Sequence, residues 1–121
     1  MIDAKPIPGS QKIVASFSPG HGQREHAGQI TIVDPKAGPD DPAFARAVSR
    51  GNQFCDPWAF SEDCFMVALG PTLMVMNGSG TQEEIFKLPD EDVQAGLQLC
   101  EPRPLQPRPR ERIIPDRSEP G

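Results

Sequence analysis

The sequence lacks the cysteine motifs that build common metal and haem sites. It contains neither CxxC nor CxxCH, and its three cysteines, Cys55, Cys64 and Cys100, cannot all pair within one chain. A zinc knuckle and a covalently attached haem are therefore excluded for this segment. Cys64 lies in an apolar run, where a buried free thiol is the expected state.

Long apolar runs are also missing. No stretch approaches eighteen apolar residues, and the N-terminal MIDAKPIPGSQKIV has no basic start followed by an apolar core. We therefore expect neither a signal peptide nor a membrane span in the chain as given. The residues themselves leave the cellular location open.

Positive charge is scarce, since the 121 residues carry a net charge of −5. Residues 101–121 hold five arginines against four acidic residues, which makes them only mildly basic, and they contain no aromatic side chain on which a base could stack. This balance argues against a nucleic-acid or anionic-membrane surface. We expect neither partner.

Apolar residues make up only 36% of the chain and gather in short runs, while fifteen prolines and eleven glycines interrupt the remainder. This composition favours short strands over long helices, within one small domain. Four of the runs form an internal repeat, in which KIVASFSP followed by GQITIVDP corresponds to CFMVALGP followed by TLMVMNGSG. The spacing is 43 residues from Ile30 to Leu73 and 52 residues from Pro19 to Pro71. A period in the forties, built from short strands, is typical of a β-propeller blade.

Both faces of CFMVAL are apolar, so this strand needs cover on each side. Without neighbouring sheets, the isolated chain is expected to be marginally stable or to associate with itself.

Turn residues separate the strands of the second repeat unit. Ser61 and Asp63 can cap a tight turn ahead of CFMVAL. Asn77 and Gly78 both tolerate positive φ and predict a hairpin, in which Gly78 is expected to have positive φ. The run EEIFKL then follows as an outer strand with a solvent edge.

The segment between the two units predicts a short connector helix over residues 42–50. Asp41 stands at the N-cap position, Pro42 at the first helical position and Gly51 beyond the end. The fold class predicted is thus all-β: antiparallel strands forming about two blades of a partial propeller, one connector helix and an extended C-terminal arm. The expected parts are an extended segment 1–9, blade-like units 10–52 and 53–100, and the arm 101–121.

The C-terminal arm is rich in proline, which restricts its backbone conformation. Pro102, Pro104, Pro107 and Pro109 alternate with arginines in LCEPRPLQPRPRERIIP, and such a segment runs extended, close to polyproline II. It can be a stiff spacer that leaves a folded domain, or a ligand shown to the groove of another protein. The PxxP of Pro104 and Pro107 lacks an arginine at either position usual for an SH3 ligand.

Two levels of family resemblance rest on these motifs. The segment AFSEDCFMVAL…TLMVMNGSGTQEEIFKL resembles the TolB-type or PD40 propeller repeat. The ordered series IVASFSPGHGQ, GQITIVDP, PWAFSEDCFMVAL and CEPRPLQPRPRERIIP is similar to the end of the propeller domain in hydrazine synthase alpha-subunit-like proteins, which are large exported bacterial proteins.

This resemblance implies a scaffold fragment whose partners are the remaining blades and a downstream domain of the same protein. It also implies a periplasmic location and a c-type haem in that downstream domain. No catalytic residue and no cofactor ligand carries over to this chain, so the segment itself is expected not to be an enzyme. The arginine and proline run marks the exit from the propeller in that family, which favours the spacer interpretation.

One alternative is a metal site in the loop PGHGQREHAG. His21 and His26 are its candidate ligands, with Glu25 between them. A plain solvated loop is the simpler interpretation, because all three side chains lie on one loop and no cysteine accompanies them.

Overall fold

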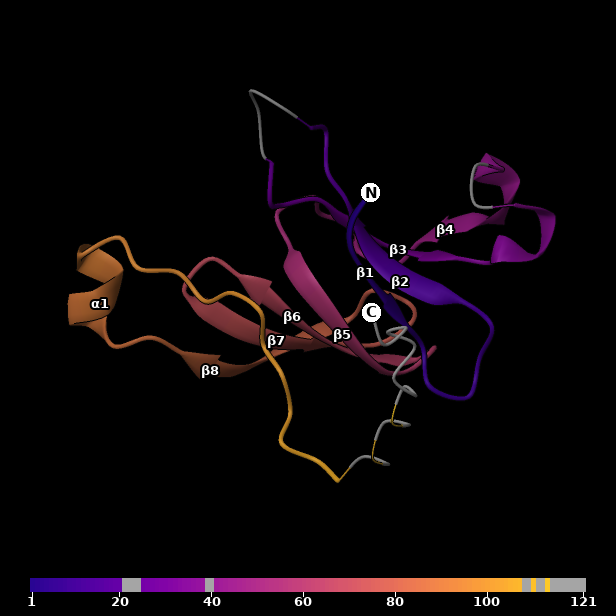
Figure 1. Ribbon diagram of the computed structural model, residues 1–121. Helices are drawn as coiled ribbons and strands as arrows, with labels where there is room; N and C mark the ends of the chain where they lie inside the picture. The colour runs from indigo at the N-terminus through magenta and orange to yellow at the C-terminus, as the bar shows by residue number, and fades with distance from the viewer. Residues whose placement is uncertain (21–24, 39–40, 108–109, 111–112, 114–121) are drawn as a thin grey trace, which may run out of the picture.

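The chain forms two four-stranded antiparallel sheets, as the computed structural model in Figure 1 shows. The structure describes residues 1–20, 25–38, 41–107, 110 and 113. In each sheet the strands follow one another in chain order, which is a meander. No helix in these residues has the length and apolar character needed to cross a membrane.

Each sheet is built from short strands. Sheet 1 contains β1 (Ile2–Pro6), β2 (Ile13–Phe17), β3 (Gln29–Val33) and β4 (Ala45–Ala47). Sheet 2 contains β5 (Cys55–Ser61), β6 (Cys64–Leu69), β7 (Thr72–Met76) and β8 (Gln82–Lys87). The only other elements among the described residues are the 3-10 turns η1 (Pro35–Ala37) and η2 (Pro42–Phe44) and the helix α1 (Asp90–Gln94).

The four apolar runs of the sequence repeat are β2, β3, β6 and β7, the second and third strands of each sheet. The prediction of antiparallel β structure is confirmed. The described residues form two open sheets and no closed ring of strands. β8 is an edge strand whose residues are all exposed, as its leading glutamates predict.

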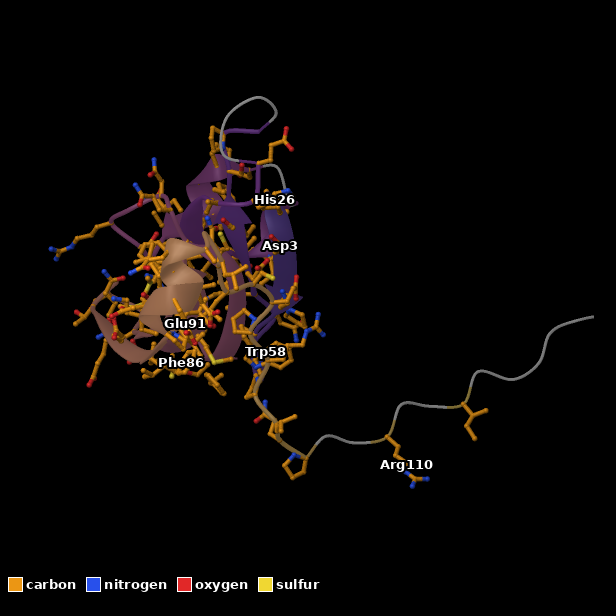
Figure 2. All side chains as sticks on the ribbon, turned by 90° about the vertical axis from the view of Figure 1, so that its left-hand side faces the viewer. Asp3, His26, Trp58, Phe86, Glu91 and Arg110 are labelled. Carbon is orange, nitrogen blue, oxygen red and sulfur yellow. The ribbon has the colours of Figure 1, made fainter. Side chains whose placement is uncertain are left out.

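The core lies between the two sheets. Sheet 1 contributes Val14, Ile30 and Ile32, and sheet 2 contributes Ala59, Phe65, Val67, Met74 and Met76. Ile7, Val48 and Phe54 from the connecting segments close its margins. The opposite face of sheet 2 carries Trp58 and Phe86, which lie on the lower side of the molecule in Figure 2, away from His26.

The predicted connector helix over residues 42–50 is wrong. Asp41 does cap the segment, because its carboxylate accepts a hydrogen bond from the Ala43 N–H at 3.0 Å. The helical turn nevertheless ends at Phe44, and residues 45–47 become β4. β3 offers an unpaired edge there, and a ladder with Val33 opposite Ala45 satisfies backbone groups that a short exposed helix would leave to water.

The N-terminal residues take part in sheet 1. β1 pairs with β2 in antiparallel register, with Pro6 opposite Ile13, and a bulge interrupts the pairing between Ile2 and Lys5. Ile7, directly after β1, is buried in the core. The segment expected to be merely extended is therefore an edge strand that anchors the chain's beginning.

Candidate functional site

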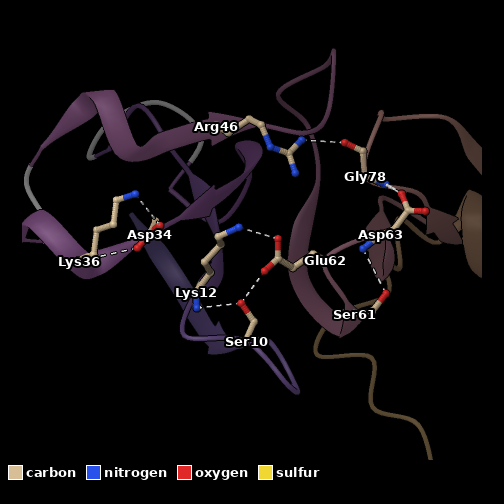
Figure 3. A network of polar contacts seen from close by, with 9 residues as sticks. All are labelled: Ser10, Lys12, Asp34, Lys36, Arg46, Ser61, Glu62, Asp63 and Gly78. Carbon is tan, nitrogen blue, oxygen red and sulfur yellow. Dashed lines mark hydrogen bonds and ion pairs between the residues drawn. The ribbon is translucent and has the colours of Figure 1, made fainter.

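Polar side chains connect the two sheets at one end (Figure 3). Lys12 donates to the Glu62 carboxylate at 2.7 Å, and the Ser10 hydroxyl donates to the same carboxylate at 2.6 Å. These bonds join the β1–β2 loop of sheet 1 to the β5–β6 turn of sheet 2. Hydrogen bonds from Lys12 and Ser10 hold the pKa of Glu62 below its ordinary value.

The turn residues singled out from the sequence meet at this end of sheet 2. The Asp63 N–H donates to the Ser61 hydroxyl at 3.1 Å, and the Asp63 carboxylate accepts from the Gly78 N–H at 2.7 Å. Arg46 on β4 donates to the Gly78 carbonyl at 2.8 Å. Asn77 accepts from the Ser79 and Thr81 backbone N–H groups, which closes the β7–β8 turn. Two turns and both sheets are thus bonded together.

The expectation of positive φ at Gly78 is wrong, because the residue with positive φ in this turn is Gly80, at 82°. Gly78 is constrained by space, since a Cβ there would lie 2.8 Å from both the Asp63 carboxylate and the Glu62 carbonyl oxygen. Gly80 is constrained by both factors, because an added Cβ would overlap the carbonyl oxygen of Val48. The hairpin signal in the sequence was sound, but the contact with Asp63 decides the roles of its glycines.

Three carboxylates gather at the opposite side, where the N-terminal strand, β5 and the arm meet. Oxygens of Asp3, Asp56 and Glu101 lie within 4.8 Å of one another, and Asp56 is buried. Asp56 Oδ2 accepts a hydrogen bond from the Glu101 N–H at 2.9 Å. These three are the non-glycine residues with positive φ in the described part of the chain, at 53°, 50° and 47°. No sequence motif links them, since they stand far apart in the chain.

This carboxylate cluster is partly neutralised by the chain itself. Lys5 lies 3.7 Å and Arg103 3.0 Å from the Glu101 carboxylate. Both cations lower the pKa of Glu101, with the Arg103 hydrogen bond as the main cause. Carboxylate oxygens are the ligands that Ca²⁺ and Mg²⁺ prefer, so the cluster could hold a hard cation. Its arrangement is also accounted for without one, because Glu101 has two cationic partners and Asp56 has a backbone N–H.

Burial, followed by the negative charge of Asp56, raises the pKa of Asp3. A carboxyl group with a raised pKa binds its proton more tightly in the folded state. The free energy of unfolding should therefore fall as pH rises from 3.8, the ordinary value for Asp3, through its raised folded value. Asp3→Asn should remove this loss and stabilise the protein at pH 7, as measured by urea unfolding at pH 4 and pH 7.

Glu62→Gln is the opposite control for this prediction. The pKa of Glu62 is lowered, so its contribution to stability is present above its ordinary pKa of 4.5 and is lost as pH falls through the folded value. This variant should lose stability at pH 7 and lose little at pH 3. Destabilisation by Asp3→Asn at pH 7 would contradict the conclusion that burial and the Asp56 charge disfavour the ionised form of Asp3.

The first residues of the arm lie against sheet 2. The Leu99 N–H donates to the Gly70 carbonyl at 2.9 Å, and the Arg103 guanidinium lies 5.9 Å from the centre of the Trp58 ring. Beside this stack is a cavity of about 290 Å³, lined by Trp58, Arg103 and residues of the β1 segment. The Trp58 indole Nε1 is buried with no hydrogen-bond partner. The arm therefore begins as a docked segment.

Among the residues proposed for partner binding, Pro102 stands between Glu101 and Arg103, in the docked part of the arm. His26 is exposed and belongs to no set of three clustered ligands among the described residues, and His21 lies outside them. Pro102, Pro104 and Pro107 have no regular secondary structure, while Pro109 lies outside the described residues.

All three cysteines are free. Cys64 is half-buried, which corrects the expectation of full burial, and Cys100 is exposed. Burial is the main cause of the raised pKa of Cys55, with the neighbouring Asp56 charge second. A raised pKa keeps this thiol protonated and poorly nucleophilic at neutral pH.

The sequence matches no family model, and the comparisons with curated proteins and with solved structures found no match.

Proposed function

We propose that this chain is a structural and interaction module, made of two blade-like units of a β-propeller that serves as scaffold in a larger exported protein. The observation that carries this proposal is the way in which the two repeat units stack. They pack through faces that are not equivalent in the repeat. Stacking of that kind can be continued by further units, as a propeller requires.

The register of the strands shows which residues of the two repeat units correspond to each other. In sheet 1, Val14 lies opposite Ile32, and in sheet 2, Met66 lies opposite Val75. Because Ile32 and Val75 are 43 residues apart, Val14 corresponds to Met66, which is 52 residues further on. These are the two spacings of the sequence repeat.

The core uses different faces of the two units. Sheet 1 packs through Val14 and Ile32, but their counterparts Met66 and Val75 are not in the core cluster. Sheet 2 packs instead through the alternate residues of the same strands, such as Phe65 and Met74. A symmetric sandwich would place equivalent faces together. The observed arrangement is head-to-tail, which supports the propeller proposal.

Reading the coding sequence that flanks this segment tests the proposal. We expect further units of four short strands with similar spacing upstream, and a domain with CxxCH motifs after the arm. A complete gene of 121 codons with no neighbouring propeller or CxxCH sequence would overturn it.

A second candidate function is an adaptor that presents the arm to a partner domain. The observation in its favour is the full exposure of two large apolar side chains, since Leu105 is 104% and Ile113 93% exposed. Such side chains are usual anchors of peptide ligands.

Deleting residues 104–121 separates the two functions and keeps the contacts of Glu101 and Arg103. If the arm is a spacer, we expect the truncated and full chains to capture the same partners in a pull-down, with the same thermal transition. If the arm is a ligand, its removal abolishes capture while the transition stays unchanged. A Leu105→Asp, Ile113→Asp double variant is the matched control, because it keeps the length of the arm.

A further inference from the structure

Two of the three free cysteines, Cys55 and Cys100, lie at the same end of sheet 2. Cys55 is the first residue of β5 and stands opposite Ala68 of β6. Two residues after Ala68, the Gly70 carbonyl accepts a hydrogen bond from the Leu99 N–H at 2.9 Å. Cys100 follows Leu99 directly, so this bond holds it beside the end of β6 where Cys55 is paired.

A second hydrogen bond holds Cys100 from its other side. The Glu101 N–H donates to Asp56 Oδ2 at 2.9 Å, and these two residues directly follow Cys100 and Cys55 in the chain. Burial is the main cause of the raised pKa of Cys55, and a negative charge on Cys100 adds to it. Each sulfur therefore lies within electrostatic range of the other.

The third cysteine, Cys64, is far from this pair. It begins β6 and stands opposite Ser61, six residues along β5 from Cys55. At about 3.3 Å per residue this is a separation of roughly 20 Å, whereas a disulfide needs Cα atoms within about 7 Å of each other. Because Cys100 lies near Cys55, the same argument excludes a bond between Cys64 and Cys100.

We propose that Cys55 and Cys100 form a disulfide that locks the root of the arm, residues 99–103, to β5. The bond forms by thiol–disulfide exchange with a small-molecule disulfide such as oxidised glutathione. The exposed Cys100, as its thiolate, attacks one sulfur of this oxidant and releases one thiol. Cys55 then gives its proton to water, attacks the Cys100 sulfur and releases the second thiol. Two protein thiols are oxidised, and the disulfide of the oxidant is reduced to two thiols.

This lock goes beyond both functions proposed above, because a spacer and a displayed ligand each begin at the same root. In the reduced chain the root is held by hydrogen bonds, by the ion pairs of Glu101 and by the contact of Arg103 with Trp58. Exposed ion pairs of this kind contribute little to stability. A covalent bond at Cys100 keeps these contacts formed and fixes the direction in which the arm leaves sheet 2.

Oxidation of the reduced full chain with oxidised glutathione tests the proposal. A protease that cuts after glutamate separates Cys55 from Cys64 at Glu62, so mass spectrometry of the unreduced digest identifies the linked pair. We expect a bond between Cys55 and Cys100. The effective concentration of two tethered thiols is on the order of 1 mM, so at about 10 µM protein the internal bond should form roughly a hundredfold faster than a bond between chains.

Serine variants are the controls. Cys64→Ser should form the internal bond at the wild-type rate. Cys55→Ser should stop at the mixed disulfide and keep one glutathione on Cys100, and Cys100→Ser should form no internal bond. Hydrogen exchange reports on the lock itself, because oxidation of the wild type should slow the exchange of the Leu99 and Glu101 amides by about tenfold.

Four results would overturn the proposal. The first two are a digest that links Cys64 to either of the other cysteines, and an oxidised wild type that carries only glutathione adducts. The third is formation of bonds between chains as fast as the internal bond. The last is unchanged exchange of both amides after the internal bond has formed. None of these results depends on the flanking coding sequence or on the pull-down that test the functions proposed above.

Discussion

Replacing Phe65 by alanine is expected to lower the free energy of unfolding by about 3–5 kcal/mol. Phe65 is fully buried on β6, between the two sheets. Its removal takes apolar area from the core and leaves a cavity that two sheets joined by several bonds cannot close. Small domains are stable by only about 5–15 kcal/mol, so this loss is a large fraction of the total stability.

The measurement is urea unfolding at 25 °C, at a protein concentration low enough to keep the chain monomeric. Phe86→Ala is the control, because the same side chain is deleted from a half-exposed position on the face of sheet 2 that points away from the core. Its cost should stay below about 1.5 kcal/mol. Equal costs for the two variants would mean that the sheets do not pack through Phe65.

Gly80→Ala is expected to cost about 2–4 kcal/mol, because two effects act at one residue. The backbone has φ of 82°, a conformation that strains an L side chain, and the added Cβ would overlap the Val48 carbonyl oxygen. That carbonyl belongs to the segment after β4, so the overlap also pushes sheet 1 away from the β7–β8 turn. The inter-sheet bond from Arg46 to the Gly78 carbonyl should weaken with it.

Two further glycine variants separate these effects. Gly9 has φ of 72° with open space around the Cβ position, so Gly9→Ala should show the conformational cost alone, about 1 kcal/mol. Gly28 does not have positive φ, but an added Cβ would overlap the backbone of Phe17, so Gly28→Ala should show the steric cost alone. Thermal unfolding of the three variants gives the order. A smaller loss for Gly80→Ala than for Gly9→Ala would show that the turn does not contact Val48.

The strands that could be predicted are those whose signal is contained in their own residues. β2, β3, β6 and β7 have apolar side chains on both faces and turn residues at their ends, and these properties do not depend on the rest of the chain. The Ser61 and Asp63 turn is equally local, since its bond spans two residues. In the same way, prolines alone exclude a helix or central strand from the arm.

Contacts between residues that are distant in the chain determined the features that the sequence did not predict. Residues 42–50 carry good helix signals, yet Ala45–Ala47 pair with β3 because the free edge of a sheet offers hydrogen bonds that a local motif cannot reveal. The role of Gly78 depends on Asp63, fifteen residues earlier. The cluster of Asp3, Asp56 and Glu101 exists only because β1, β5 and the arm meet.

By itself the sequence determined the class of fold, the order of the repeated strands and the absence of helix and strand at Pro102, Pro104 and Pro107, because side-chain alternation and proline geometry act within a few residues. Which face of each sheet is buried could not be determined in this way, since both faces of β6 are apolar. Only the packed structure shows that Phe65 turns inward and Met66 outward. The pairing of these two faces follows from that choice, because the energy of burial depends on what the opposite sheet presents.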